Sequence, residues 1–90
     1  MNSKLEDFVN SLKLPANGQY SGNEYIITFD NSDDFSDIFN LISLNKTLTA
    51  EDNMVATEDN CISIFTDGWY EIKLVANFKD DIYRIFVGER

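Results

Sequence analysis

The sequence predicts an α+β domain in which two amphipathic helices pack on an antiparallel sheet, in the order α-β-α followed by a β-meander. Apolar residues recur with helical spacing in the first half of the chain and with a period of two in the second half. Very short polar links separate the last three apolar segments, as they do in meanders. Because amphipathic helices need a sheet face to cover, the two patterns together predict a two-layer fold.

The first element is a helix over residues 3–13. Ser3 suits the N-cap position, and Glu6, three residues later, completes a capping box. Pro15 and Gly18 end the helix. Its apolar face, at the spacing i, i+3, i+4 and i+7, consists of Leu5, Phe8, Val9 and Leu12.

A strand and a second helix follow. Residues 24–29, EYIITF, are β-branched and aromatic, which is typical of a strand. Ser32 is placed to cap the helix, and Asp33 and Asp34 fall in its first turn, where the helix dipole favours negative charge. The buried stripe of this helix is expected to be Phe35, Ile38, Phe39 and Ile42.

The period of two predicts three strands near the end of the sequence. They are expected at residues 61–65, 69–78 and 82–87, linked by Thr66-Asp67-Gly68 and by Lys79-Asp80-Asp81. Along the middle strand the side chains that share one face are Tyr70, Ile72, Leu74 and Ala76. Trp69 has two interpretations, a core residue with its N–H satisfied or an exposed aromatic anchor for a partner.

The triplet Glu-Asp-Asn occurs twice, at residues 51–53 and 58–60. Residues 46–49 and 54–57 fit short strands, for which residues 51–53 would be the turn. Asp and Asn favour turns because their side chains bond the local backbone, so turn formation alone explains both triplets. The alternative interpretation is that the acidic pairs extend a charged binding surface.

The chain has the size of one domain, 90 residues, and residues 1–90 are treated as a single domain. No apolar run approaches the ~20 residues of a membrane span, and residues 1–12 lack the apolar stretch of a secretory signal. Cys61 is the only cysteine, so no disulfide forms within the chain. These features predict a cytoplasmic protein.

The chemistry of most enzymes is absent from the sequence. There is no histidine, only one cysteine and no glycine-rich phosphate-binding loop. Residues 30–37, DNSDDFSD, resemble the start of a calcium loop, but Phe35 and Leu41 occupy the positions that need glycine and glutamate. We therefore expect a protein that is not an enzyme and that has no cofactor and no metal.

The acidic residues are unevenly distributed. The net charge is −9, and the segment from Leu14 to Ile72 contains eleven acids and one base, Lys46. A field of this sign repels nucleic acid and anionic membranes and attracts basic surfaces. The expected partner is therefore a basic protein, without direct binding to nucleic acid or to a membrane.

The candidate partner-binding residues are acids on the second helix and in the two triplets: Asp30, Asp33, Asp34, Asp37, Glu51, Asp52, Glu58 and Asp59. On a helix, Asp33, Asp34 and Asp37 fall opposite the apolar stripe, with neighbours about 5–6 Å apart. Carboxylates held at such spacing can occupy Lys and Arg sites that bind phosphates. The alternative is a solvated helix face that only maintains solubility.

Residues 22–42, GNEYIITFDNSDDFSDIFNLI, resemble a known class of proteins in their strand, acidic turn and helix layout. The class comprises small acidic proteins of phages and other mobile elements, of which the anti-CRISPR proteins are the best-known members. The resemblance covers about a quarter of the chain and concerns composition and architecture. It implies a bacterial host cell and a DNA mimic that inhibits a basic nucleic-acid-binding protein such as a CRISPR effector.

Two other functions fit the same sequence. One is an immunity protein that neutralises a basic nuclease toxin through its acidic surface. The other is a phage or plasmid structural adaptor that binds through an apolar patch or a sheet edge. Salt weakens binding in the first case and has little effect in the second. Self-association into a homo-oligomer is compatible with all of these functions.

Overall fold

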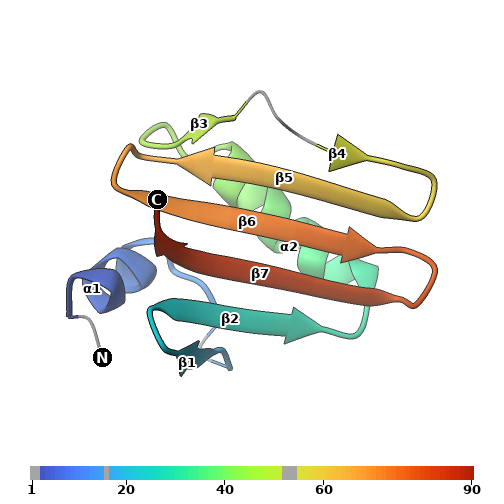
Figure 1. Cartoon of the computed structure of the whole chain (residues 1–90), viewed down its shortest axis with the longest axis horizontal. Helices are drawn as coiled ribbons and strands as arrows, with labels where there is room; N and C mark the ends of the chain where they lie inside the picture. The colour runs from blue at the N-terminus through green and yellow to red at the C-terminus, as the bar shows by residue number, and fades with distance from the viewer. Residues whose placement is uncertain (1–2, 16, 52–54) are drawn as a thin grey trace.

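The computed structural model describes residues 3–15, 17–51 and 55–90 of the chain. In this part of the chain, two helices lie on one face of a seven-stranded antiparallel sheet (Figure 1). The helices are α1 (Ser3–Ser11) and α2 (Ser32–Ser43), and the strands are β1 (Gln19–Ser21), β2 (Glu24–Phe29), β3 (Thr49–Ala50), β4 (Val55–Ala56), β5 (Asn60–Thr66), β6 (Tyr70–Asn77) and β7 (Ile82–Glu89). The predicted α+β class is confirmed.

The sheet joins the two halves of the chain at its centre. The strand order is β1-β2-β7-β6-β5-β3, and β4 also pairs with β5. The strands β5, β6 and β7 form the predicted meander, whereas β2 pairs with β7. Ile27 and Ile85 are opposite each other in this pairing, and both are fully buried. The strand before α2 therefore lies beside the last strand of the sheet.

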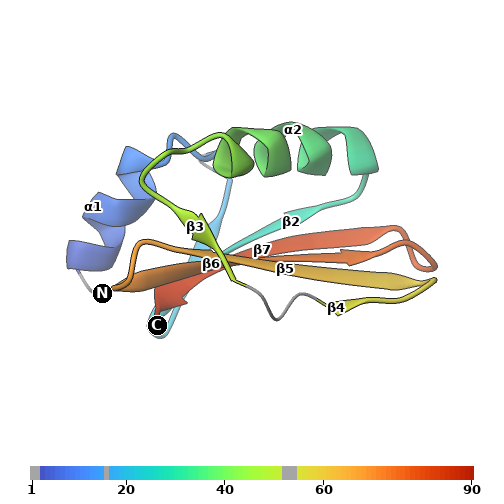
Figure 2. The same ribbon diagram turned by 90° about the horizontal axis from the view of Figure 1, so that it is seen from above.

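The core lies between the helices and the sheet face that they cover. Figure 2 shows both helices on the same side of the sheet. The period of two in β6 places Ile72 and Leu74 beneath the helices, and these side chains are 0% and 1% exposed. The helices contribute Leu5, Val9, Phe35 and Ile42 to the same core, and Leu12 joins it from the turn after α1. Neither described helix has the length and apolarity that crossing a membrane would need.

The second acidic triplet begins in the turn between β4 and β5, where the turn interpretation places it. The backbone N–H of Thr57 donates to the carbonyl of Asn60 at 2.7 Å, with Glu58 and Asp59 at the tip. The expected hairpin between residues 46–49 and 54–57 is wrong, because β3 and β4 each pair with β5. Of its proposed turn, residues 52 and 53 lie outside the described part of the chain.

Two helix ends differ from the expectation. Helix α1 ends at Ser11 and not at residue 13, because Lys13 has a left-handed backbone with φ 57°. The N-cap of α2 is Asn31 and not Ser32, which is the first helical residue. The Asn31 side chain accepts from the backbone N–H of Asp34 at 2.9 Å and so satisfies a donor that a helix end leaves unpaired.

Replacing this cap should destabilise the protein. We expect Asn31→Ala to lower the free energy of unfolding by about 1 kcal/mol, since the amide oxygen of Asn31 is lost as an acceptor. Ser32→Ala is the matched control and should have a smaller effect, because Ser32 is not the cap. Urea unfolding followed by circular dichroism measures both variants, and a larger loss in the control would contradict the assignment.

Candidate functional site

Six of the predicted partner-binding acids lie at one end of the molecule. Asp30, Asp33, Asp34 and Asp37 belong to the approach and first turns of α2, and Glu58 and Asp59 form the tip of the β4–β5 turn. All six are exposed. Figure 1 shows the start of α2, the β4–β5 turn and the β6–β7 turn at the same end of the sheet. The structure therefore brings these acids to a common region, which we name the acidic end.

The β6–β7 turn adds two acids that the sequence analysis did not include. Asp80 and Asp81 are exposed in this turn, which also contains the basic residue Lys79. The location of these two acids could have been predicted from the sequence. In a meander, the turn that precedes the first strand and the turn that follows the second must share an end of the sheet. The β6–β7 turn therefore had to lie beside Glu58 and Asp59.

Hydrogen bonds connect the segments of the acidic end. The backbone N–H of Phe78 donates to the carbonyl of Asp59 at 2.8 Å and joins the two turns. The Tyr83 hydroxyl donates to Asp81 Oδ1 at 2.8 Å. This hydrogen bond to Asp81, together with burial, raises the pKa of Tyr83 above its ordinary value. The Tyr83 ring also packs against Phe35 of α2 at a centroid distance of 5.3 Å, so β7 contacts the start of α2.

The side chain of Asn31 fixes two of the carboxylates on the α2 side. Its amide nitrogen donates to Asp30 Oδ1 at 3.2 Å and to Asp34 Oδ2 at 3.1 Å. Because the amide oxygen of Asn31 also caps the helix, these two acids are held in place by the same residue. Asp33 and Asp37 are exposed on the outer side of α2. The carboxylates of Asp30 and Asp34 are therefore oriented before any partner arrives.

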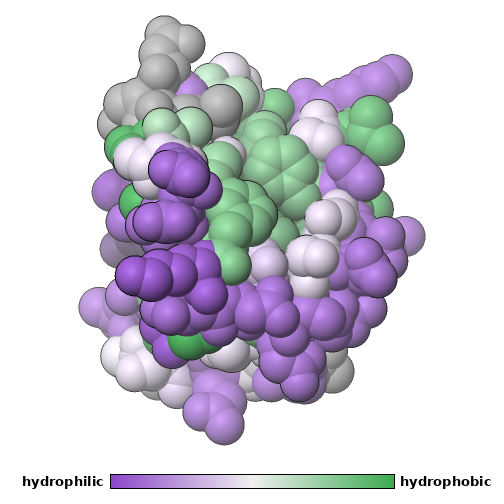
Figure 3. Space-filling view, turned by 90° about the vertical axis from the view of Figure 1, so that its right-hand side faces the viewer, coloured by the Kyte–Doolittle hydropathy of each residue, from purple (hydrophilic) through white to green (hydrophobic). Residues whose placement is uncertain are grey.

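An apolar groove opens at the acidic end between α2 and the sheet. Its volume is about 210 Å³, and its walls include Phe35, Phe39, Cys61, Leu74, Phe78 and Tyr83. Figure 3 shows this apolar hollow with hydrophilic residues on both sides. Phe78 is 53% exposed, although it is a large hydrophobic residue. The groove is therefore a place at the acidic end where an apolar side chain of a partner could be buried.

Glu51 does not belong to the acidic end. It follows β3, which pairs with the other end of β5 through Thr49 and Thr66. Its carboxylate forms an ion pair of 2.8 Å with Arg90, which compensates its charge. The structure therefore does not bring Glu51 together with the α2 acids. Asp52, the remaining candidate, lies outside the described residues.

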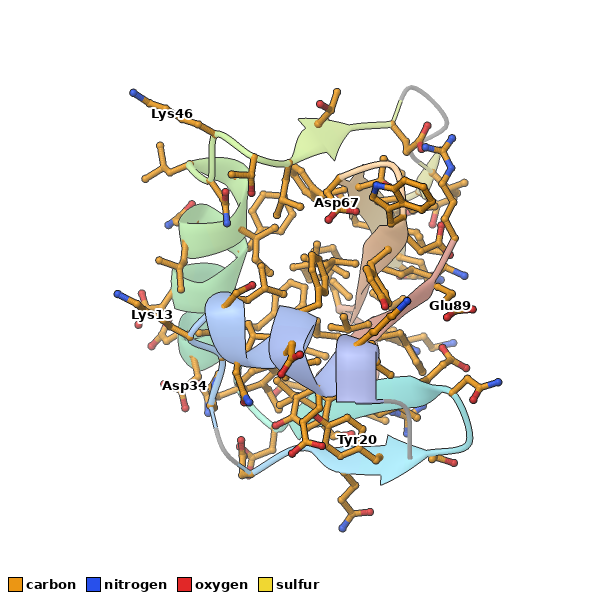
Figure 4. The ribbon with its side chains drawn as sticks, turned by 90° about the vertical axis from the view of Figure 1, so that its left-hand side faces the viewer. Lys13, Tyr20, Asp34, Lys46, Asp67 and Glu89 are labelled. Carbon is orange, nitrogen blue, oxygen red and sulfur yellow. The ribbon has the colours of Figure 1, made fainter. Side chains whose placement is uncertain are left out.

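The opposite end of the molecule carries charges of both signs. Figure 4 views this end and labels Lys13, Lys46, Asp67 and Glu89 there. Trp69 lies in the β5–β6 turn and is 80% exposed, so its interpretation as a core residue is wrong. Its backbone N–H donates to Asp67 Oδ1 at 2.9 Å, which orders the turn. Among the described residues, the strongly single-signed surface is thus the acidic end.

Comparison with other proteins identifies no relative: no family model matches the chain, and no curated protein or solved structure is similar to it. The arrangement of side chains is therefore the basis for a functional assignment. Within residues 3–15, 17–51 and 55–90, no three acidic or thiol side chains are grouped so that they could hold a metal ion.

Proposed function

We propose that this protein is a non-enzymatic inhibitor whose acidic end binds a basic nucleic-acid-binding protein in the place of DNA phosphates. The observation that carries the proposal is the charge of the three segments at this end. Residues 30–37, 57–60 and 78–81 contain eight acids and one base. Such a field attracts a cationic groove from a distance and increases the rate of association.

The support of the carboxylates favours binding over a purely solubilising role. Asp30 and Asp34 are held by Asn31, and Asp81 is held by the Tyr83 hydroxyl. Fixed carboxylates lose less conformational entropy when they bind Lys or Arg than mobile ones do. On α2 the acids are three and four residues apart, which gives separations of about 5–6 Å. Lys and Arg side chains that bind a row of phosphates can bind such a row of carboxylates.

The apolar groove explains how such an inhibitor could bind a protein tightly. Charge pairs at the rim of an interface contribute mainly to rate and specificity, whereas buried anchors contribute most of the affinity. The exposed ring of Phe78 and the walls formed by Phe35 and Phe39 offer a place for one such anchor. The partner surface that fits is therefore an apolar side chain surrounded by Lys and Arg.

Within this class, CRISPR effectors are the first partners to test, because of the resemblance to anti-CRISPR proteins. The site of action would then be the cytoplasm of a bacterial cell. A basic nuclease toxin offers the same kind of cationic groove, so the immunity function remains the second candidate. It is supported by the same acidic end. The two functions differ only in the partner that is bound.

Competition with nucleic acid tests the proposal. A tagged chain is used to capture its partner from a bacterial lysate, and CRISPR effectors and nuclease toxins are tested in parallel. A gel-shift assay at roughly 50 and 300 mM salt should show mutual exclusion of the protein and the nucleic acid, with weaker protein binding at the higher salt. The protein alone should not shift DNA or RNA. A stable ternary complex, or binding that salt does not affect, would contradict the mimicry.

A further inference from the structure

The sheet face that the helices leave open carries an unusual set of residues. Because Ile72 and Leu74 point to the core, Glu71, Lys73 and Val75 point to the open face. The pairing register arranges the residues of this face in rows across the strands. One row is Thr28, Arg84, Val75 and Ile62; the next is Ile26, Phe86, Lys73 and Ile64; the third is Glu24, Gly88, Glu71 and Thr66.

This face combines five apolar residues with four charged ones, and its charges balance, unlike those of the acidic end. The charged residues of the three rows are Glu24, Glu71, Lys73 and Arg84, whose charges sum to zero. The apolar residues are only partly buried, and neither described helix covers them (Figure 2). An antiparallel sheet that faces water on one side normally shows polar residues there. A group of neighbouring, partly exposed apolar side chains is instead typical of an interface.

A hollow of about 450 Å³ lies in the third row, beside Phe86. Gly88 has no side chain, and it stands between Glu24 and Glu71 in this row. A Cβ atom at Gly88 would lie 3.3 Å from the carbonyl oxygen of Asn23, which is closer than most side-chain contacts. The backbone of Gly88 thus contributes to the floor of the hollow, which Glu24 and Glu71 flank, and the Phe86 ring lies about 7 Å along the same strand.

We propose that two copies of this chain pack face to face through the open sheet surface, with Phe86 of each copy over Gly88 of the other. A two-fold axis that runs across the strands, between the second and third rows, produces this arrangement. The same axis places Lys73 opposite the partner's Glu71, and Val75 opposite the partner's Trp69. Sheets packed in this way lie about 10 Å apart, so side chains of the two faces interdigitate.

The positions of the charged residues favour this register over the one that is shifted by one row. An axis one row away, between the first and second rows, would bring Lys73 and Arg84 of both copies together without an acid between them. Burying four like charges is unfavourable. In the proposed register, Lys73 has a carboxylate opposite it. Arg84 lies opposite the partner's Arg90, whose charge is compensated by Glu51 within its own chain.

The same two-fold axis keeps the acidic ends of the two copies apart. It reverses the strand direction of the second copy, so the two acidic ends lie at opposite ends of the dimer. Two chains of charge −9 can therefore associate with little repulsion, which salt at about 150 mM screens further. Both acidic ends and both apolar grooves remain accessible. The dimer is thus independent of the proposed inhibitory function and would make it bivalent.

Sedimentation of the full chain and of two charge variants tests the proposal. The protein concentration is about 100 µM, because an interface at the small end of the usual range is expected to be weak. At this concentration the wild type should have twice the 10.3 kDa chain mass. Lys73→Glu places two acids opposite each other, and Glu71→Lys places two bases opposite each other. Each variant alone should dissociate at least tenfold more readily, whereas an equimolar mixture should form heterodimers with both charge pairs restored.

A third variant guards against loss of folding. Trp69→Ala removes a side chain that is 80% exposed and leaves the backbone hydrogen bonds of its turn, so the fold should be retained by circular dichroism. It should weaken the dimer by about tenfold, because a buried Trp is a typical interface anchor. A wild type that stays monomeric would overturn the proposal. Tighter association of Lys73→Glu would also overturn it, because that result fits the neighbouring register. A mixture of the two charge variants that stays monomeric would overturn it as well.

Discussion

Reversing two charges at the acidic end should weaken partner binding by more than about 100-fold, since each close charge pair in an interface can contribute a factor of ten or more. The variant is Asp33→Lys together with Asp37→Lys, which leaves Asp34 and its bonds to the Asn31 cap intact. The fold should survive, because an unfavourable charge in the first helical turn costs about 0.3–1 kcal/mol. Isothermal titration with the captured partner measures the loss of affinity.

The matched control carries the same charge change on the other helix. Glu6 and Asp7 are exposed on α1, and Glu6 lies in the first turn of that helix. Glu6→Lys together with Asp7→Lys should reduce affinity much less, because this pair is remote from the acidic end. Equal losses in the two variants would show that net charge matters and that its location does not. Wild-type affinity in the Asp33 and Asp37 variant would exclude mimicry through α2.

Ile72→Ala should be among the most destabilising single substitutions, with a loss of about 2–5 kcal/mol in the free energy of unfolding. Ile72 is 0% exposed beneath the helices at the centre of β6, so its truncation leaves a cavity that the sheet cannot close. A domain of this size has a total stability of roughly 5–13 kcal/mol, and the variant therefore loses a large part of it. Urea unfolding at low protein concentration gives the difference.

Ile26→Ala is the control for this substitution. Ile26 lies on the open face of β2 and is only partly buried, so its truncation should cost less than about 1.5 kcal/mol. The two positions share residue type and strand environment and differ in the face of the sheet. If both variants lost the same stability, the division into a covered and an open face would be incorrect.

The helices and the long strands could be predicted because the spacing of apolar residues within each segment indicates its secondary structure. The strand at residues 24–29 has the predicted bounds, and the strands of the meander differ by two residues at most. Strand β1 was not predicted, because Gln19-Tyr20-Ser21 is short and mostly polar. It becomes a strand through Gly22, whose φ of +61° reverses the chain, and through the Tyr20 ring that packs 4.7 Å from Tyr25.

The candidate site depended on contacts that no local pattern contains. The acids at Asp33 and Glu58 could be recognised individually, but their common location follows from the direction in which α2 crosses the sheet. The ion pair of Glu51 with Arg90 joins residues far apart in the sequence and was for that reason not predictable. The exposure of Trp69 could have been predicted from the sequence. Side chains alternate along a strand, and Trp69 is two residues from Glu71 and four from Lys73, which point away from the core.

The position of β7 between β2 and β6 has a consequence for synthesis on the ribosome. Until residues 82–89 have emerged, β2 has no central strand to pair with, and α1 and α2 have only part of the sheet to cover. The nascent chain must therefore keep two amphipathic helices and a strand such as EYIITF from aggregating until translation of β7 is complete. Its excess of acidic residues, concentrated in the segments made before β7, keeps such unfinished chains apart by repulsion.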